Sequence, residues 1–364
     1  MKKNILFLII GILIGVIITS IVFYIYEETH KPKFEDFDEM RRMDRGPMGE
    51  DFRGDRGPME ESAPKTTTAD DVDSGVTVTD KDIDLSKYSS NITIEEEGEY
   101  TLSGNFEYAV LVNSTDDVTL VLNGVDIKNN LTAAIANIGQ GNLSIRLEEN
   151  TENNLSDGGS SEYDACIYSN GALIIEGNGT LNVYGNQEEG EGIATETNDI
   201  TINGGTINIE CQDDGINAGG DGGLITINGG DIYIKANGDG IDSNKNLVIN
   251  GGNVYTIGSP TGGDAGIDTD DGYEINGGTV IALGSDMLER PESSSKQKSV
   301  TYELKSKVSS GSAVSIQNSN GTEIVSFEAK EDFRTLIVSN DKVENGSYTL
   351  YVNGEKTENT ATVK

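Results

Sequence analysis

The stretch that decides the fold is Ile200-Thr-Ile-Asn-Gly-Gly-Thr-Ile-Asn-Ile-Glu-Cys211, because the chain repeats it three more times. The later copies are Ile225-Thr-Ile-Asn-Gly-Gly-Asp-Ile-Tyr-Ile-Lys-Ala236, Leu247-Val-Ile-Asn-Gly-Gly-Asn-Val-Tyr-Thr256 and Tyr273-Glu-Ile-Asn-Gly-Gly-Thr-Val-Ile-Ala282. The Asn-Gly-Gly turns begin at Asn203, Asn228, Asn250 and Asn276, with spacings of 25, 22 and 26 residues. Repeats of this length, built only of strand-like pieces, predict a solenoid or an array.

Apolar and polar residues alternate within each copy, as in strands whose side chains point to opposite faces. The alternation places one residue of every copy in each of several inward columns. These columns are Ile202, Ile227, Ile249 and Ile275; Ile207, Ile232, Val254 and Val280; and Cys211, Ala236, Gly258 and Gly284. The columns are buried if coils stack about 4.8 Å apart. We therefore expect an all-β, right-handed parallel β-helix; the alternative, a β-propeller, needs blades of about 40 to 45 residues.

The same register extends back to residues 172–183 with one extra turn residue, and weaker coils occupy residues 91–155. We expect the β-helix to cover residues 75–295. From residue 296 the coil repeat stops, and short alternations separated by Asn-Gly turns predict a small β cap over residues 296–364. An end coil of a solenoid needs such a cover.

The N-terminus predicts the location of the protein. Residues 5–26 form an apolar segment without charge, and this segment is long enough to span a bilayer as a helix. We therefore interpret residues 1–26 as a transmembrane anchor. Lys2 and Lys3 before the span orient the rest of the chain outward, at the cell surface. A cleaved signal peptide is the alternative. Residues 27–74 are rich in Pro and charge, and we expect a disordered linker.

The composition excludes several partners. Asp and Glu total 62 against 26 Lys and Arg, a net charge of -36, which would repel nucleic acid and anionic lipid. His30, beside the predicted anchor, is the single histidine. A metal in the folded part must therefore be bound by oxygen ligands.

Acidic residues recur between the Asn-Gly-Gly turns, in Glu191-Gly-Ile-Ala-Thr195, Asp214-Gly-Ile-Asn-Ala218, Asp239-Gly-Ile-Asp-Ser243 and Ala265-Gly-Ile-Asp-Thr269. Stacked coils place Asp214 over Asp239, where two charges repel by about 3 to 4 kcal/mol at an effective dielectric of 20. A compensating Ca²⁺ is predicted. The candidate metal ligands are Asp213, Asp214, Asn217, Asp239, Asp242, Asp264 and Asp268. The alternative is that these residues only suit solvated turns.

Three further residue sets have structural or weaker functional interpretations. The Asn203 column is expected to form a ladder of amides that stabilises the turns. Cys166 and Cys211 are interpreted as buried free thiols, with a disulfide as the alternative. Tyr233 and Tyr255 occupy the same outward position in successive coils and are candidates for stacking on a sugar ring.

An enzymatic function has little support in the sequence. Between Arg146 and Arg290 the chain has no Arg or His, and its only Lys residues are Lys235 and Lys245. A polysaccharide lyase needs a cationic base or clamp to stabilise the developing charge. Hydrolysis by two carboxylates stays open, although the sequence shows no apolar pocket to raise the pKa of one of them.

The chain also resembles a known family. The residues that carry the resemblance are 118–125, 153–158, 164–175, 213–217, 238–242, 284–287 and 293–297. In this order they are similar to the bacterial carbohydrate-binding domain family of calcium-binding parallel β-helix proteins from cellulolytic clostridia, over residues 77–349. The chain departs from the pattern at Ala265, where the two preceding coils have Asp214 and Asp239.

The resemblance implies a non-catalytic surface protein that binds plant cell-wall polysaccharide, either an acidic polygalacturonate-type glycan or cellulose. Two alternatives remain: a structural or adhesive stalk without sugar specificity, and a β-helix glycoside hydrolase.

Overall fold

In a computed structural model, residues 75–159, 163–220, 223–359 and 361–363 are described, and all belong to one compact unit, residues 66–364. The all-β prediction is confirmed for this part of the chain, whose elements are strands and one short 3-10 helix, η1 (Leu85–Lys87). None of its helices is long and apolar enough to cross a membrane. The predicted anchor, residues 1–26, and linker, residues 27–74, lie outside the described residues.

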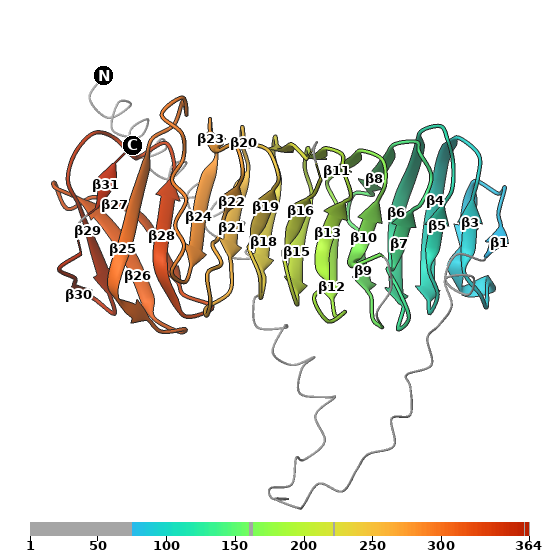
Figure 1. Cartoon of the computed structure of the whole chain (residues 1–364), viewed down its shortest axis with the longest axis horizontal. Helices are drawn as coiled ribbons and strands as arrows, with labels where there is room; N and C mark the ends of the chain where they lie inside the picture. Colours follow the sequence, from blue (N-terminus) through green and yellow to red (C-terminus); the bar gives the residue numbers. More distant parts are fainter. Residues whose placement is uncertain (1–74, 160–162, 221–222, 360, 364) are drawn as a thin grey trace, which may run out of the picture. The chain divides into compact units, whose positions relative to one another are not determined.

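Most strands stack along one axis and pair in parallel with the equivalent strand of the next coil, so the predicted β-helix is confirmed (Figure 1). One face, which we call the narrow sheet, has nine strands, one per coil. These are β1 (Val76–Thr77), β3 (Ile92–Ile94), β5 (Val110–Val112), β7 (Ile135–Asn137), β10 (Ala165–Ser169), β13 (Glu191–Thr195), β16 (Ile216–Ala218), β19 (Ile241–Ser243) and β22 (Asp268–Thr269).

Two further faces complete each coil, and strands β4 (Gly98–Phe106) and β6 (Val118–Lys128) run over both. The second face continues with β8 (Leu143–Leu147), β11 (Leu173–Gly177), β14 (Ile200–Ile202), β17 (Ile225–Ile227), β20 (Leu247–Ile249) and β23 (Tyr273–Ile275), and begins at β2 (Asp82–Asp84). The third face continues with β9 (Glu152–Ser156), β12 (Thr180–Gly185), β15 (Thr206–Cys211), β18 (Asp231–Lys235), β21 (Asn253–Ile257) and β24 (Thr279–Gly284).

The predicted inward columns form the core. Ile202 pairs with Ile227, and Ile227 with Ile249, and all three side chains are fully buried. Burying one such side chain stabilises the fold by about 1.5 to 3 kcal/mol. Cys166 and Cys211, both within the described residues, are buried and free, as expected.

The Asn-Gly-Gly turns need their second glycine. Gly230 has a φ of 104°, a conformation that side chains with a Cβ rarely adopt, and a Cβ there would lie 2.9 Å from the carbonyl oxygen of Gly205. The equivalent glycines of the other copies have similar positive φ values. The repeat therefore reflects backbone geometry as well as core packing.

Antiparallel strands cover the last coil, because β28 (Phe333–Ser339) pairs with β24. On the other side of β28 lies β25 (Ser299–Val308), and β31 (Thr362–Val363) pairs with β25. A second sheet contains β27 (Glu323–Glu328), β26 (Ala313–Asn318), β29 (Tyr348–Val352) and β30 (Glu355–Lys356). The C-terminal segment thus forms short strands that cover the end coil, as the alternations predicted.

Candidate functional site

The predicted acidic residues stack on the outer side of the narrow sheet. The register pairs Asn217 with Asp242 and Asp242 with Asp268, so these three side chains follow one another in consecutive coils. They point outward because the preceding residues in β16 and β19, Ile216 and Ile241, are buried in the core. We call the following set the acid row: Glu191, Asp213, Asp214, Asn217, Asp239, Asp242, Asp264 and Asp268.

Two carboxylates of the acid row also hold the coils together. Oδ1 of Asp214 accepts a hydrogen bond of 2.6 Å from the backbone N–H of Asp239, and Oδ1 of Asp239 accepts one from the N–H of Ala265. Asn217 donates from Nδ2 to Oδ2 of Asp214 over 3.1 Å. This chain of hydrogen bonds stops at Ala265, which has no carboxylate to continue it.

The carboxyl groups of the acid row are held where ionisation is unfavourable. Burial, followed by the charge of Asp164, raises the pKa of Glu191 to about 8. Burial raises the pKa of Asp239 to about 7 despite the hydrogen bond from Ala265, and burial with the charge of Asp214 raises that of Asp242 to about 7. The pKa of Asp214 rises to about 6, again chiefly through burial.

The remaining predicted ligands lie close enough to act on these groups. Burial and then the charge of Asp264 raise the pKa of Asp213. Burial, Asp270 and Asp264 raise the pKa of Asp268, against a hydrogen bond from the backbone of Thr269 that lowers it. In the part of the chain that the structure describes, the ion pairs between side chains involve no member of the acid row. No fixed countercharge among these ion pairs therefore favours ionisation of the row.

The oxygen atoms of the acid row suit a hard cation. Carboxylate and amide oxygens of adjacent coils are the ligand types that Ca²⁺ takes, together with backbone oxygen and water. Oε2 of Glu191 is buried and has no hydrogen-bond partner. Within the described ranges, however, no three His, Cys, Asp or Glu side chains form a group arranged to hold a metal ion. Any ion here would need amide, backbone or water oxygens beside the carboxylates.

Two acidic residues at this site were missing from the predicted ligands. Glu191 occupies the position of Asp214 one coil earlier, a correspondence that the repeat Glu191-Gly-Ile does contain. Glu289 lies in the loop after β24, where no repeat could reveal it. Its Oε1 accepts a 2.7 Å hydrogen bond from the hydroxyl of Thr269, and its pKa is raised to about 7, mainly by burial.

The tyrosine pair lies elsewhere. Tyr233 and Tyr255 are neighbours in the register, as expected, and their rings stack with centroids 5.6 Å apart. Phe327 of β27 packs edge-on against Tyr255 at 5.7 Å, and burial raises the pKa of both tyrosines. Because the rings form part of the contact with the C-terminal strands, we assign them no sugar-binding role.

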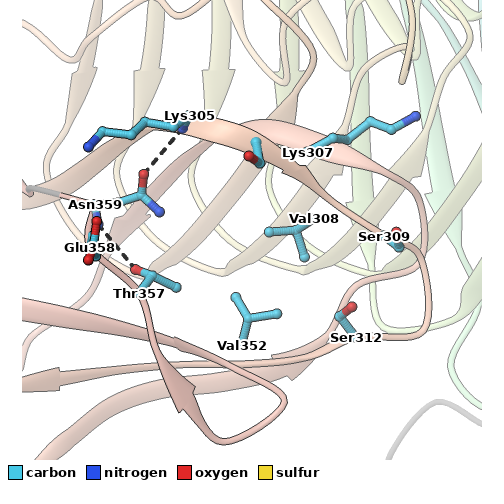
Figure 2. A pocket seen from close by; sticks show the side chains of 10 residues that line it. Lys305, Lys307, Val308, Ser309, Ser312, Val352, Thr357, Glu358 and Asn359 are labelled. Carbon is cyan, nitrogen blue, oxygen red and sulfur yellow. Dashed lines mark hydrogen bonds between the residues drawn. The ribbon is translucent and has the colours of Figure 1, made fainter.

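A hollow of about 410 Å³ lies between the C-terminal strands (Figure 2). Val308 and Val352 line its interior, and polar groups on its rim bond to each other: Asn359 Oδ1 accepts from the backbone N–H of Lys305 over 3.2 Å. Lys307, also on the rim, is paired with Asp332 at 2.7 Å. We assign this hollow no function.

Comparison with known proteins identifies a family. The model of a family described as carbohydrate-binding domain-containing protein matches residues 88–332. A carbohydrate-binding domain-containing protein of Acetivibrio thermocellus is 31% identical over 153 residues, which cover 39% of this chain and 49% of the relative. The match thus spans about half of that relative's length.

Among solved structures, a gadolinium derivative of a polysaccharide lyase-like protein from C. thermocellum is similar over 51% of this chain and 84% of that chain. Its sequence is 26% identical and the TM-score is 0.39, so we draw no conclusion from this likeness.

Proposed function

The chain belongs to the family of carbohydrate-binding domain-containing proteins, and on this basis we propose that it binds polysaccharide without cleaving it. The matched residues, 88–332, include the whole acid row. The observation that carries the proposal is this row of stacked, partly buried carboxylates without a fixed countercharge. It gives the chain a surface on which cations and polar ligands can gather.

We further propose that the acid row binds Ca²⁺. Asp214 and Asp239 face each other in adjacent coils, and Asn217 and Asp242 lie beside them, so the row offers carboxylate and amide oxygens of two coils. When bound, Ca²⁺ supplies positive charge and coordination positions that a carboxylate of another molecule can fill. The stacked carboxylates would then be ionised at neutral pH, since a nearby positive charge lowers their pKa values.

The proposed ligand of this row is an acidic, polygalacturonate-type polysaccharide. A chain with a net charge of -36 repels a polyuronate, so the two can associate closely only through a shared cation. The acid row would hold one side of that cation and the uronate carboxylates the other. Affinity should therefore depend on calcium.

At Asp239 and Asp242, binding is favoured over hydrolysis by the similarity of the two carboxyl groups. A glycoside hydrolase assigns different roles to two carboxyls by giving them different pKa values. Asp239 and Asp242 both have pKa values near 7, raised by the same cause. The environment of this pair therefore does not separate an acid from a nucleophile or base.

The location is also a proposal: the anchor at residues 1–26 would hold the β-helix outside a cell membrane. Protease added to intact cells should then digest the linker, residues 27–74, and release the β-helix. The location would be wrong if the chain of intact cells stayed uncut under conditions in which the protease digests it after lysis.

The proposed function is tested by retention of the full chain on immobilised polygalacturonate with Ca²⁺ and with chelator. We expect retention only with Ca²⁺, and its loss in the variant Asp239→Asn with Asp242→Asn. The matched control is Glu148→Gln with Glu149→Gln, which removes two exposed charges outside the acid row and should bind normally. Absence of binding to any polysaccharide would instead support a structural stalk.

A further inference from the structure

Many asparagines of this chain are followed directly by glycine, and such pairs can react without an enzyme. The backbone nitrogen of the glycine attacks Cγ of the asparagine, a five-membered succinimide ring closes, and the amide nitrogen leaves as ammonia. Water then opens the ring at either carbonyl, which gives aspartate or isoaspartate. Glycine favours this attack because it has no Cβ beside the nitrogen. The reaction needs an amide that can turn and a glycine N–H that is not committed elsewhere.

In the Asn-Gly-Gly turns, the ladder holds the asparagine amides. Asn228 donates from Nδ2 to Oδ1 of Asn203 over 2.9 Å, and Asn250 donates in the same way to Asn228 over 2.9 Å. Asn276 continues the ladder by donating to Asn250 over 3.2 Å. Each of these amides must break at least one hydrogen bond before it can react.

The Asn-Gly pairs outside these turns are held in one of two ways, with one exception. At Asn170 and Asn353, Oδ1 accepts a hydrogen bond, from the hydroxyl of Tyr168 over 3.0 Å and from the backbone N–H of Ala313 over 2.9 Å. At the others, the glycine N–H donates a hydrogen bond; these pairs are Asn123-Gly124, Asn178-Gly179, Asn237-Gly238 and Asn320-Gly321.

The exception is Asn345-Gly346, in the connection between β28 and β29. Both residues are exposed, and within the described residues no hydrogen bond is seen for the Asn345 amide or the Gly346 N–H. A Cβ built on Gly346 would meet no atom within 4 Å, so the backbone is open here. We propose that Asn345 is a site of spontaneous modification, at which the folded chain converts asparagine into aspartate and isoaspartate.

The position of the pair gives this modification a structural consequence. Tyr348 closes the segment, because its hydroxyl accepts a 2.8 Å hydrogen bond from the N–H of Glu344 and donates one of 2.9 Å to the carbonyl oxygen of Glu344. Isoaspartate adds a methylene group to the main chain between these two residues. Both products also place a new negative charge next to Glu344 in the sequence. The modification therefore changes the segment that leads into β29.

The test incubates the folded full chain at mildly alkaline pH and follows each asparagine by peptide mapping with mass spectrometry. The Asn345 peptide should gain the mass difference between an amide and an acid. The Asn228 peptide should convert more slowly by about tenfold or more, because its two amide hydrogen bonds must break first. Conversion of Asn345 no faster than that of Asn228 would overturn the proposal.

The same incubation in denaturant separates the fold from the local sequence. Without the fold, the two peptides should convert at similar rates. A difference that persists undiminished in denaturant would mean that the fold does not select Asn345, and the proposal would be wrong.

The variant Gly346→Ala tests the attacking atom while it keeps the asparagine. The fold should tolerate the added methyl group, since it meets no neighbour and Gly346 does not have a positive φ, and conversion at Asn345 should become slower. The matched control is Gly263→Ala, at another exposed glycine whose Cβ would meet no neighbour, and it should leave the rate unchanged. Equal rates in the two variants would contradict attack by the Gly346 nitrogen. Polysaccharide binding takes no part in these measurements, so their outcome is independent of the proposed function.

Discussion

The acid row and the ladder of turn asparagines, Asn203, Asn228 and Asn250, are built by the same stacking but have opposite electrostatics. In each, one position of the coil recurs in register, as Asn217, Asp242 and Asp268 do on the narrow sheet and as Asn203, Asn228 and Asn250 do beside the second face. In a β-helix, the side chains at one position of successive coils thus form a row. What the row does depends on whether neighbours of that type attract or repel.

The difference decides what each surface requires. Stacked amides satisfy each other, and each such hydrogen bond contributes about 0.5 to 1.5 kcal/mol. Stacked carboxylates repel, which adds to the effect of burial and leaves the pKa values of Asp239 and Asp242 near 7. The acid row therefore needs protons or a cation, whereas the asparagine ladder is complete without either.

The largest expected effect comes from the core that both surfaces share. Ile227→Ala should lower the free energy of unfolding by about 2 to 5 kcal/mol, because a fully buried side chain leaves a cavity. Denaturant unfolding measures this. The neighbouring change Thr226→Ala, at a partly exposed outward position, should cost about 0.5 kcal/mol or less. Similar costs at both positions would contradict the inward and outward assignment.

Calcium should distinguish the two surfaces next. At a Ca²⁺ concentration 100 times the Kd, binding to the folded state adds about 2.7 kcal/mol of stability, and chelator removes it. Thermal unfolding should show this gain for the unmodified chain and for Asn228→Ala. The gain should be absent in the variant Asp239→Asn with Asp242→Asn. A gain of the same size in this variant would show that calcium does not bind at the acid row.

The pH dependence of stability without calcium is a third distinction. Asp239 and Asp242 have folded pKa values near 7 against about 3.9 in an unfolded chain, so the folded state binds more protons between these values. Their contribution to stability is therefore fully present below about pH 4 and is lost as the pH rises through about 7. Melting temperatures of calcium-free protein should show this decline.

In Asp239→Asn with Asp242→Asn the decline should become shallower, since these groups no longer titrate. An unchanged slope would show that the pH dependence arises from the other acidic residues of the chain.

The smallest effect concerns the ladder. Asn228→Ala removes two amide hydrogen bonds at an exposed site, so we expect a loss of roughly 1 kcal/mol in denaturant unfolding. Asn244→Ala, at an exposed position for which no ladder bond is seen, is the control. A loss above about 3 kcal/mol would mean that the ladder is a major structural support.

The repeat made much of this architecture predictable. Four copies fix which residues lie over one another, so the columns of Ile202 and Asn203 and the stacking of Asp242 on Asp268 followed from spacing alone. One extra residue in the turn of residues 172–183 did not disturb this, since Ile175 pairs with Ile202 and Thr180 with Thr206.

What the sequence could not reveal lies outside the repeat. Tyr233 and Tyr255 have the pattern of an exposed aromatic pair, but Phe327 of β27, a strand distant in sequence, packs against Tyr255. Glu289 lies close to Asp268 of the acid row, in a loop that no copy resembles. Contacts between distant segments depend on how the C-terminal strands fold back, and local spacing carries no information on that.

The central claim is that the acid row binds an acidic polysaccharide through Ca²⁺. The direct measurement is the affinity of the unmodified full chain and of the variant Asp239→Asn with Asp242→Asn for polygalacturonate, with Ca²⁺ and with chelator. We predict that the unmodified chain binds only with Ca²⁺ and that the variant does not bind. Equal binding by the folded variant, or binding by the unmodified chain that persists with chelator, would contradict the account.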